Sequence, residues 1–197
     1  IAATKTVSVE AIRAAQQAGV TICGEKRVQE AAAKIPQDPG MTRHLIGHLQ
    51  RNKARRAAEL FEMIHSLESP RLAVVLDRIG TERGRPIAAL IEVNVAEEPS
   101  KSGVSPSELS SLVEHVAGRH GLVIHGLMAI PPLVDEPART RGYFRKLAQL
   151  AADLRKRSLP GVSAGHLSMG MSSDYELAVE EGATFVRVGT ALFGPRE

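Results

Sequence analysis

Two short segments near the C-terminal end of the chain carry residues that could bind an anion. Residues 168–173 read Ser-Met-Gly-Met-Ser-Ser and residues 189–190 read Gly-Thr; each follows an apolar, strand-like run and precedes a helical pattern. Backbone N–H groups at the start of a helix lack partners inside it and favour a negative charge. Two such turns on neighbouring strands of a βα repeat predict a cradle for a phosphate group.

A lysine lies at the opposite end of the chain, in the apolar run Ile1-Ala-Ala-Thr-Lys5. Side chains alternate between the two faces of a strand, so Lys5 would share a face with Ile1 and Ala3. If the first and last strands are neighbours, the amine faces the phosphate cradle. A lysine amine opposite such a cradle is what pyridoxal 5'-phosphate (PLP) requires, because its aldehyde condenses with an amine. Taken alone, Lys5 could also be a solvated residue at a strand end.

An arginine interrupts the last apolar run, Phe185-Val-Arg-Val-Gly-Thr190. A charge inside an apolar strand costs free energy unless it is paired, so Arg187 needs a partner. One interpretation is an ion pair with a carboxylate, and the other is contact with the pyridine nitrogen of a cofactor. An arginine only donates hydrogen bonds, so the ring nitrogen would stay unprotonated and act as a weaker electron sink. That favours holding the cofactor, or a narrow reaction such as racemisation.

The chain alternates short apolar runs with amphipathic ones, which predicts parallel strands joined by helices. Eight such units favour a (β/α)8 barrel, with one domain over residues 1–197; the alternative is an open doubly wound sheet, although no G-x-G-x-x-G follows a strand. The expected strands are residues 1–6, 20–24, 43–47, 63–67, 87–94, 122–128, 162–167 and 184–188. The expected helices are residues 9–18, 26–34, 50–61, 70–78, 106–119, 136–157 and 173–181.

Chemistry in such a barrel gathers at the C-terminal ends of the strands. The predicted strands end in small, polar or flexible side chains. Together these residues indicate a pocket that they would line. They include Lys5, Gly24, Glu25, Gly47, Ser66, Asn94, Met128, Ser168, Gly189 and Thr190. The histidines, among them His44, His65 and His166, lack metal-ligand spacing and are interpreted as core or rim residues.

Composition excludes several classes of protein. The chain has 43% hydrophobic residues, and 25 Lys and Arg against 22 Asp and Glu give a net charge of only +3. The basic run 51–56 has no interleaved aromatic residue for stacking on bases, so a solvated helix face is favoured over nucleic-acid binding. The single cysteine, Cys23, indicates a reducing, cytoplasmic compartment and offers no metal site. The apolar runs are too short to span a bilayer.

The residues resemble the pyridoxal phosphate homeostasis proteins, the YggS/PROSC family of small PLP-binding barrels. The shared stretches are residues 3–6, 24–25, 28–30, 44–53, 65–66, 94, 101–103, 126–131, 167–174 and 186–194.

The resemblance implies a barrel of the alanine-racemase type and a role for each matching residue. Lys5 would carry PLP as an aldimine, and Arg187 would face the pyridine nitrogen. Asn94 and Met128 would line the pocket. The residues expected at the phosphate are Ser168, Met169, Gly189 and Thr190.

Two departures from the family pattern stand out. Lys26 replaces the usual Asn after Gly24-Glu25, which puts a cation near the expected cofactor site. The family's usual helix before the first strand is also missing, and the chain opens inside an apolar run without Met, so we expect that a segment precedes Ile1. A loop lysine, Lys101, is a candidate second acceptor of PLP during delivery, against the simpler interpretation of a solvated side chain.

Three functions fit these residues. The favoured one is a monomeric, non-enzymatic carrier that holds PLP and delivers it to apoenzymes, with no nucleic acid or membrane as partner. The second is a PLP-dependent, racemase-like enzyme, but the two tyrosines, Tyr143 and Tyr175, lie in predicted helices, so a second catalytic base is missing. The third is a phosphosugar-binding barrel that forms a Schiff base without PLP.

Overall fold

The computed structural model describes residues 1–37, 40–132, 134 and 136–194. Eight strands form one sheet in sequence order, and each neighbouring pair is parallel. The strands are β1 Ala2–Ala3, β2 Ile22–Glu25, β3 Thr42–Leu45, β4 Met63–Leu67, β5 Ile87–Glu92, β6 Leu122–Met128, β7 Val162–Met171 and β8 Phe185–Arg187.

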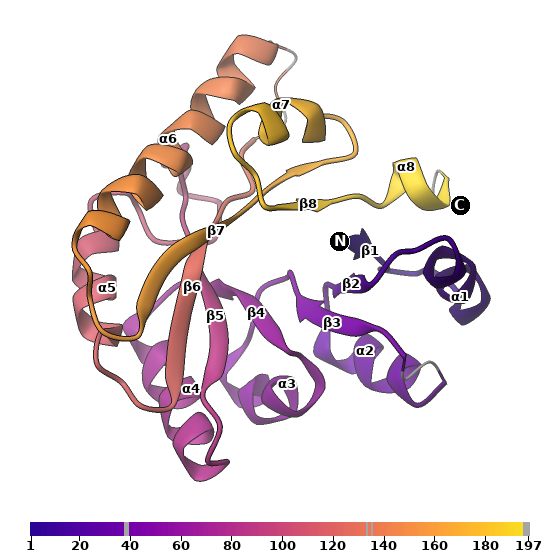
Figure 1. The fold of residues 1–197 in the computed structure, drawn as a ribbon, viewed down its shortest axis with the longest axis horizontal. Coiled ribbons are helices and arrows are strands. Elements are labelled where there is room, and N and C mark those ends of the chain that lie inside the picture. The colour runs from indigo at the N-terminus through magenta and orange to yellow at the C-terminus, as the bar shows by residue number, and fades with distance from the viewer. Residues whose placement is uncertain (38–39, 133, 135, 195–197) are drawn as a thin grey trace.

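Helices separate the strands and lie outside the sheet, in sequence order around it (Figure 1). The α-helices are α1 Val9–Gln17, α2 Val28–Lys34, α3 Ala54–Leu60, α4 Pro70–Glu82, α5 Leu109–Val116, α6 Pro137–Lys156, α7 Tyr175–Glu180 and α8 Thr190–Phe193. Two short 3-10 helices are η1 Ile35–Gln37 and η2 Arg51–Lys53.

Hydrogen bonds between the first and last strands close the sheet into a barrel. The Ala3 N–H donates to the Val188 carbonyl at 2.9 Å, and the Val188 N–H donates to the Ile1 carbonyl at 3.0 Å. β1 and β8, which come from opposite ends of the sequence, are therefore neighbours (Figure 1). The predicted (β/α)8 barrel is confirmed, and the open doubly wound alternative is wrong.

Two predicted strand ends at the C-terminal side of the barrel differ most from the structure. The first strand ends at Ala3 rather than at residue 6, because the backbone turns after it and Thr6 adopts a left-handed φ of 60°. β7 continues to Met171, so Ser168 lies in a strand rather than in a turn. The strand continues to Met171 because Ser168 pairs with Met128 of β6 and Met171 pairs with Arg187 of β8. The register with β8 shifts between Ser168 and Met171, where Gly170 has a left-handed φ of 88°.

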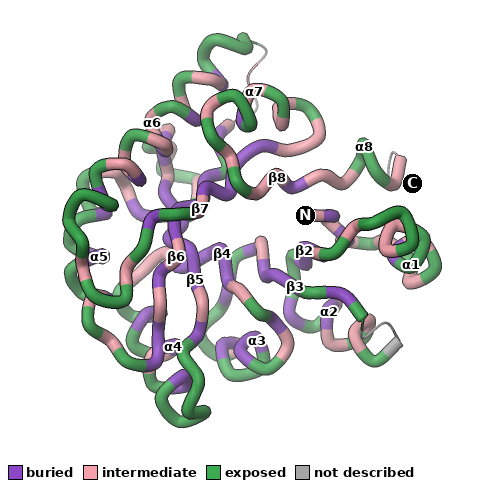
Figure 2. Tube along the Cα trace, viewed as in Figure 1, coloured by how far each residue is buried: buried purple, intermediate pink, exposed green. Residues whose placement is uncertain are grey.

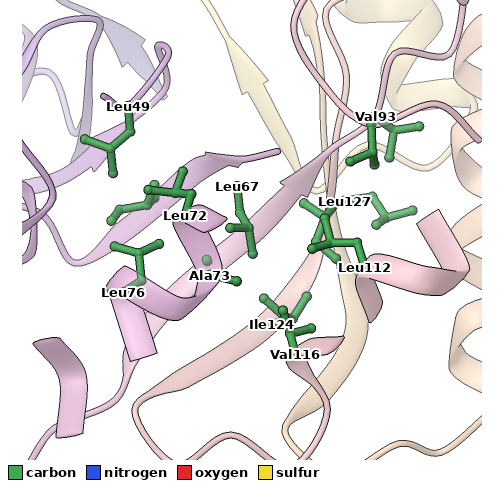
Figure 3. Close-up of a cluster of buried hydrophobic side chains, with 14 of the residues drawn as sticks. Leu49, Leu67, Leu72, Ala73, Leu76, Val93, Leu112, Val116, Ile124 and Leu127 are labelled. Carbon is green, nitrogen blue, oxygen red and sulfur yellow. The ribbon is translucent and has the colours of Figure 1, made fainter. Parts of the chain in front are cut away.

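The hydrophobic core fills the space between the strands and the helices around them. Figure 2 shows buried residues along the strands and exposed ones on the outer helix faces. Figure 3 shows part of this layer, where Leu72 and Leu76 of α4 lie near Leu67 of β4. Helix α4 starts where the Ser69 hydroxyl accepts the Leu72 N–H at 3.3 Å, with Pro70 in the first turn.

The same helix approaches the barrel closely at Gly80. A Cβ atom on Gly80 would lie 1.9 Å from the Gly121 carbonyl oxygen, so only glycine fits this position. Within the described residues, no helix is long and apolar enough to cross a membrane.

The core packing of α4 gives a direct test. We expect Leu76→Ala, at a fully buried position, to lower the free energy of unfolding by about 3 kcal/mol, because it leaves a cavity. Val74→Ala is the control on the same helix, since Val74 is 47% exposed, and it should change stability by less than about 0.5 kcal/mol. Urea unfolding measures both, and equal losses would contradict this packing.

Candidate functional site

A cavity of about 520 Å³ opens at the C-terminal ends of the strands, a size suited to a small molecule. It brings together four of the predicted site residues, from opposite ends of the chain: Lys5, Arg187, Gly189 and Thr190. The remaining lining residues are Ala3, Gly24, Lys26, Ile46, Ile130, Met171, Ser172 and Ser173. Barrel closure creates this meeting, because β1 and β8 are hydrogen-bonded neighbours.

Lys5 follows β1 in a turn whose backbone is held on both sides. The Thr4 hydroxyl donates to Glu25 Oε1 at 2.8 Å, and Lys34 Nζ donates to the Thr4 carbonyl at 2.6 Å. Glu30 Oε1 accepts the Thr6 N–H at 2.6 Å. These contacts fix the backbone around Lys5, so its side chain enters the cavity from a fixed base.

Glu25 anchors that turn from inside the barrel. Its side chain is fully buried, with Lys34 Nζ 3.6 Å away and Arg43 Nη1 3.5 Å away. Burial raises the pKa of Glu25, whereas the hydrogen bond from Thr4 and the charges of Lys34 and Arg43 oppose that rise. The two cations thus support a carboxylate that water does not reach.

The turns after β7 and β8 form a set of converging donors. Ser172 Oγ accepts the Gly189 N–H at 3.2 Å and the Ala191 N–H at 3.3 Å, so both N–H groups point at one oxygen position. Such an arrangement of hydroxyl and backbone N–H groups suits a phosphate oxygen. Of the predicted segment 168–173, the cavity lining contains Met171, Ser172 and Ser173, because β7 ends at Met171 and the turn begins after it. Ser172 and Ser173 lie within that predicted segment but were not among the individual residues expected at the phosphate.

Four other predicted site residues lie outside the cavity lining. Ser168, Met169 and Met128 are fully buried in β7 and β6. The Asn94 side chain closes the loop after β5, where Nδ2 donates to the Glu98 carbonyl at 2.7 Å and Oδ1 accepts the Glu98 N–H at 3.3 Å. Any contact of these residues with a ligand remains a prediction.

Arg187 is buried, and neutral groups hold its guanidinium. Nη1 donates to Ser168 Oγ at 2.7 Å, and Nη2 donates to the Ala129 carbonyl at 2.9 Å. No carboxylate lies within ion-pair distance of it in the described part of the chain. Burial lowers the pKa of Arg187 to about 10, so it still carries its charge at neutral pH. The absence of an ion pair favours the ligand-facing interpretation of this arginine.

The cavity is strongly cationic. Lys5, Lys26 and Arg187 line it, and no Asp, Glu, His or Tyr does so among the residues described. Lys26 also lines an adjacent groove of about 510 Å³, together with Arg27 and Lys53. Lys26, the residue that departs from the family pattern, therefore lines both the cavity and the adjacent basic groove.

Several candidates from the sequence lie away from this cavity. Lys101 is half-buried in the loop after β5, where its N–H donates to the Glu98 carbonyl. The Tyr143 hydroxyl accepts from Arg139, and that of Tyr175 donates to Glu176. Neither tyrosine lines the cavity, and no group of three metal-ligating side chains occurs in the described ranges.

The basic run 51–56 lies in η2 and the start of α3, and its arginines at 55 and 56 are exposed and ion-paired. Arg55 pairs with Glu82 at 2.6 Å, and Arg56 pairs with Glu59 at 2.8 Å.

Comparison with known proteins defines the class first. A family model for the alanine racemase N-terminal domain matches residues 2–197, and an alanine racemase of Clostridium difficile 630 shares the fold. That likeness has a TM-score of 0.78 at 15% identity and covers 95% of this chain and 48% of the racemase chain. The chain is thus a barrel of the alanine racemase N-terminal domain type.

Closer relatives identify the particular family. A pyridoxal phosphate homeostasis protein of Aquifex aeolicus is 41% identical over 199 residues, which cover 100% of this chain and 86% of the relative. The structure of PipY from Synechococcus elongatus PCC7942 without PLP superposes with a TM-score of 0.92 at 44% identity, covering 98% of this chain and 91% of PipY. PipY with PLP bound gives 0.90 at 43%, with the same coverage. The chain belongs to the family of pyridoxal phosphate homeostasis proteins.

Glu92, a buried carboxyl group near Arg187, has a raised pKa. Glu92, at the end of β5, is 6% exposed. Burial and the neighbouring Glu68 raise the pKa of Glu92 to about 7, and the charge of Arg187 opposes them. In the unfolded chain the carboxyl titrates near its ordinary value of 4.5. The native state therefore binds more protons between these two values, and Glu92 lowers stability as the pH rises through this window.

We expect Glu92→Gln to flatten this dependence. The variant should gain about 2 kcal/mol of stability relative to the unmutated chain between pH 5 and pH 8, because glutamine carries no charge to bury. Urea unfolding at the two pH values measures the gain. Glu59→Gln, at an exposed position on α3, is the control and should show no such difference. A gain at pH 5 as large as that at pH 8 would contradict the assignment.

Proposed function

We propose that this protein binds PLP covalently through Lys5 and takes part in cellular PLP homeostasis by holding the cofactor and delivering it. The observation that carries the proposal is the single cavity in which the Lys5 amine, the Arg187 guanidinium and the converging donors at Ser172 meet. An amine, a phosphate cradle and a ring-nitrogen donor are the groups that PLP needs. The PLP-bound structure of PipY, a relative with the same barrel, supports the same ligand here.

Each residue has a chemical role in this proposal. The Lys5 amine adds to the aldehyde carbon and water leaves, so a C=N bond replaces the C=O bond. The phosphate would replace Ser172 Oγ as the acceptor of the Gly189 and Ala191 N–H groups, and the hydroxyls of Ser172 and Ser173 would donate to it. Arg187 donates a hydrogen bond to the ring nitrogen and keeps it unprotonated, because a guanidinium has no lone pair with which to accept.

A carrier role accounts for the site better than catalysis. PLP supplies an aldehyde and an electron-withdrawing ring, and racemisation on that ring needs a base on each face of the substrate. The cavity wall carries no carboxylate, histidine or tyrosine among the described residues. The likeness to racemases at 15% identity concerns the fold alone. A free aldehyde condenses with any amine, so sequestering it has a chemical purpose.

The proposal extends to the cellular setting. We propose a monomer in the cytoplasm that delivers PLP to apoenzymes, with no nucleic acid or membrane among its partners. The ion pairs of Arg55 and Arg56 support the absence of a nucleic-acid role, because glutamates neutralise these two cations of the basic run 51–56.

Reductive trapping tests the covalent link. Borohydride reduction of the protein mixed with PLP should place a phosphopyridoxyl group on Lys5, and Lys5→Ala should lose both the label and the visible absorbance band. Lys101→Ala is the matched control, because that lysine lies outside the cavity lining, and it should keep both. Peptide mapping by mass spectrometry locates the label; a label on another residue in the unmutated chain would overturn the proposal.

The basic groove at Lys26 leads to a prediction about the rate of binding. A cationic track attracts an anionic ligand, so the association rate should fall as salt increases. Lys26→Asn should slow PLP association a few-fold at low salt and should weaken its salt dependence. Arg85→Asn removes one charge from an exposed ion pair with Glu62, before the start of β5, and should leave the salt dependence unchanged. Stopped-flow absorbance measures these rates; identical salt dependence in both variants would contradict a role for the groove.

A further inference from the structure

A chain of hydrogen bonds runs behind Arg187 through the barrel interior. Arg187 Nη1 donates to Ser168 Oγ at 2.7 Å, Ser168 Oγ lies 2.9 Å from His65 Nδ1, and His65 Nε2 lies 3.0 Å from His44 Nδ1. The residues come from β8, β7, β4 and β3, and each side chain is at most 4% exposed. The function proposed above uses only the first of these four residues.

The first donor fixes the direction of the chain. A guanidinium only donates, so Ser168 Oγ must accept from Arg187. If the Ser168 hydroxyl then donates to His65 Nδ1, His65 carries its proton on Nε2 and donates to His44 Nδ1. The reverse direction would give Ser168 Oγ a second donor and leave its own hydrogen without an acceptor in the described structure, at a position with no exposure.

The charge of Arg187 favours the same direction. With the proton on Nε2, the electron-rich Nδ1 of His65 faces the cation and the N–H points away from it. Burial lowers the pKa of His44 to about 4, and burial, followed by the charges of His44 and Arg187, holds the pKa of His65 well below its ordinary value. Both rings are therefore neutral at physiological pH, and each has one proton in a defined place.

We propose that Ser168, His65 and His44 are positioning residues that hold Arg187 in its ligand-facing orientation through this one-directional hydrogen-bond chain. Without it, a buried guanidinium would retain only the Ala129 carbonyl as an acceptor and would turn to find another. The effect on the ligand rests on the proposed function, because Arg187 is the group that would meet the ring nitrogen of PLP. The chain itself exists in the protein without ligand and can be tested there.

A third histidine nearby supplies the control. His166 lies on β7, two residues from Ser168, and its ring contacts that of Phe185 in a tilted arrangement with centroids 4.7 Å apart. Its Nδ1 lies 3.2 Å from Thr184 Oγ1, so it belongs to no part of the chain behind Arg187. A substitution at His166 disturbs the same region of the barrel and leaves the four linked groups intact.

The first experiment measures the tautomers in the ligand-free protein. Nitrogen-15 NMR of protein labelled at histidine, with His44→Gln and His65→Asn used for assignment, distinguishes a protonated from an unprotonated ring nitrogen. We expect His44 and His65 to carry the proton on Nε2 alone at pH 7. A proton on Nδ1 of either ring, or a charged ring, would overturn the direction of the chain.

The second experiment tests positioning. His65→Leu removes the acceptor for Ser168 and should weaken PLP binding at equilibrium by about tenfold, as expected when a buried hydroxyl group loses its hydrogen-bond partner. It should also shift the nitrogen-15 resonance of PLP labelled at the ring nitrogen. His65→Asn places an amide oxygen near the former Nδ1 and should restore both values, and His166→Leu should change neither. A His65→Leu variant with the original affinity and ring-nitrogen resonance would overturn the proposal.

Circular dichroism and thermal unfolding show whether His65→Leu folds. If it does not, the tautomer measurement and the comparison of His65→Asn with the unmutated chain test the proposal instead. If the unmutated protein bound no PLP at Lys5, the proposed function would fail, whereas the tautomers would still confirm or overturn the chain.

Discussion

The candidate site depends on a buried positive charge, the guanidinium of Arg187. Its position inside the barrel removes it from water, and no described carboxylate lies within ion-pair distance of it. Neutral acceptors therefore solvate it: the Ser168 hydroxyl and the Ala129 carbonyl. A carboxylate partner would have neutralised the charge and occupied its donors. Neutral acceptors leave the charge available to whatever enters the cavity, at the cost of a polar network inside an apolar barrel.

Closure of the barrel brings Lys5, Gly189 and Thr190 into the same cavity as this charge. The hydrogen bonds between β1 and β8 set Lys5, near the start of the chain, beside Gly189 and Thr190 near its end. The two sides are supported independently: Glu25 and Lys34 hold the turn at Lys5, and Ser172 gathers the N–H groups after β8. An amine and an anion cradle thus meet across a seam that depends on a few backbone hydrogen bonds.

Sequence patterns predicted the repeating elements well and the site less completely. β4 and β6 have the predicted boundaries. β4 lies between Glu62 and Glu68, and β6 starts directly after Gly121. β7 was predicted too short because Ser-Met-Gly-Met is typical of a turn, and only pairing with β6 and β8 shows that the strand continues to Met171. The turn in the predicted segment 168–173 therefore begins at Ser172, and a contact of Ser168 with a phosphate remains a prediction. The contacts of His65, with His44 21 residues away and Ser168 103 residues away, leave no local signal in the sequence.

The cavity wall shows how a barrel shared with racemases can serve to hold a cofactor. A reactive aldehyde needs one accessible amine, whereas turnover of an amino acid also needs groups that accept and return protons. In the proposed complex the link would consume the Lys5 amine, the phosphate would occupy the serine and backbone groups, and Arg187 can only donate hydrogen bonds. Lys26 is the one titratable lining group left among the described residues, and it lies exposed where the cavity meets the outer groove. If Arg187 keeps the ring nitrogen unprotonated, as proposed, the ring is a weak electron sink and the site favours holding the cofactor over catalysis.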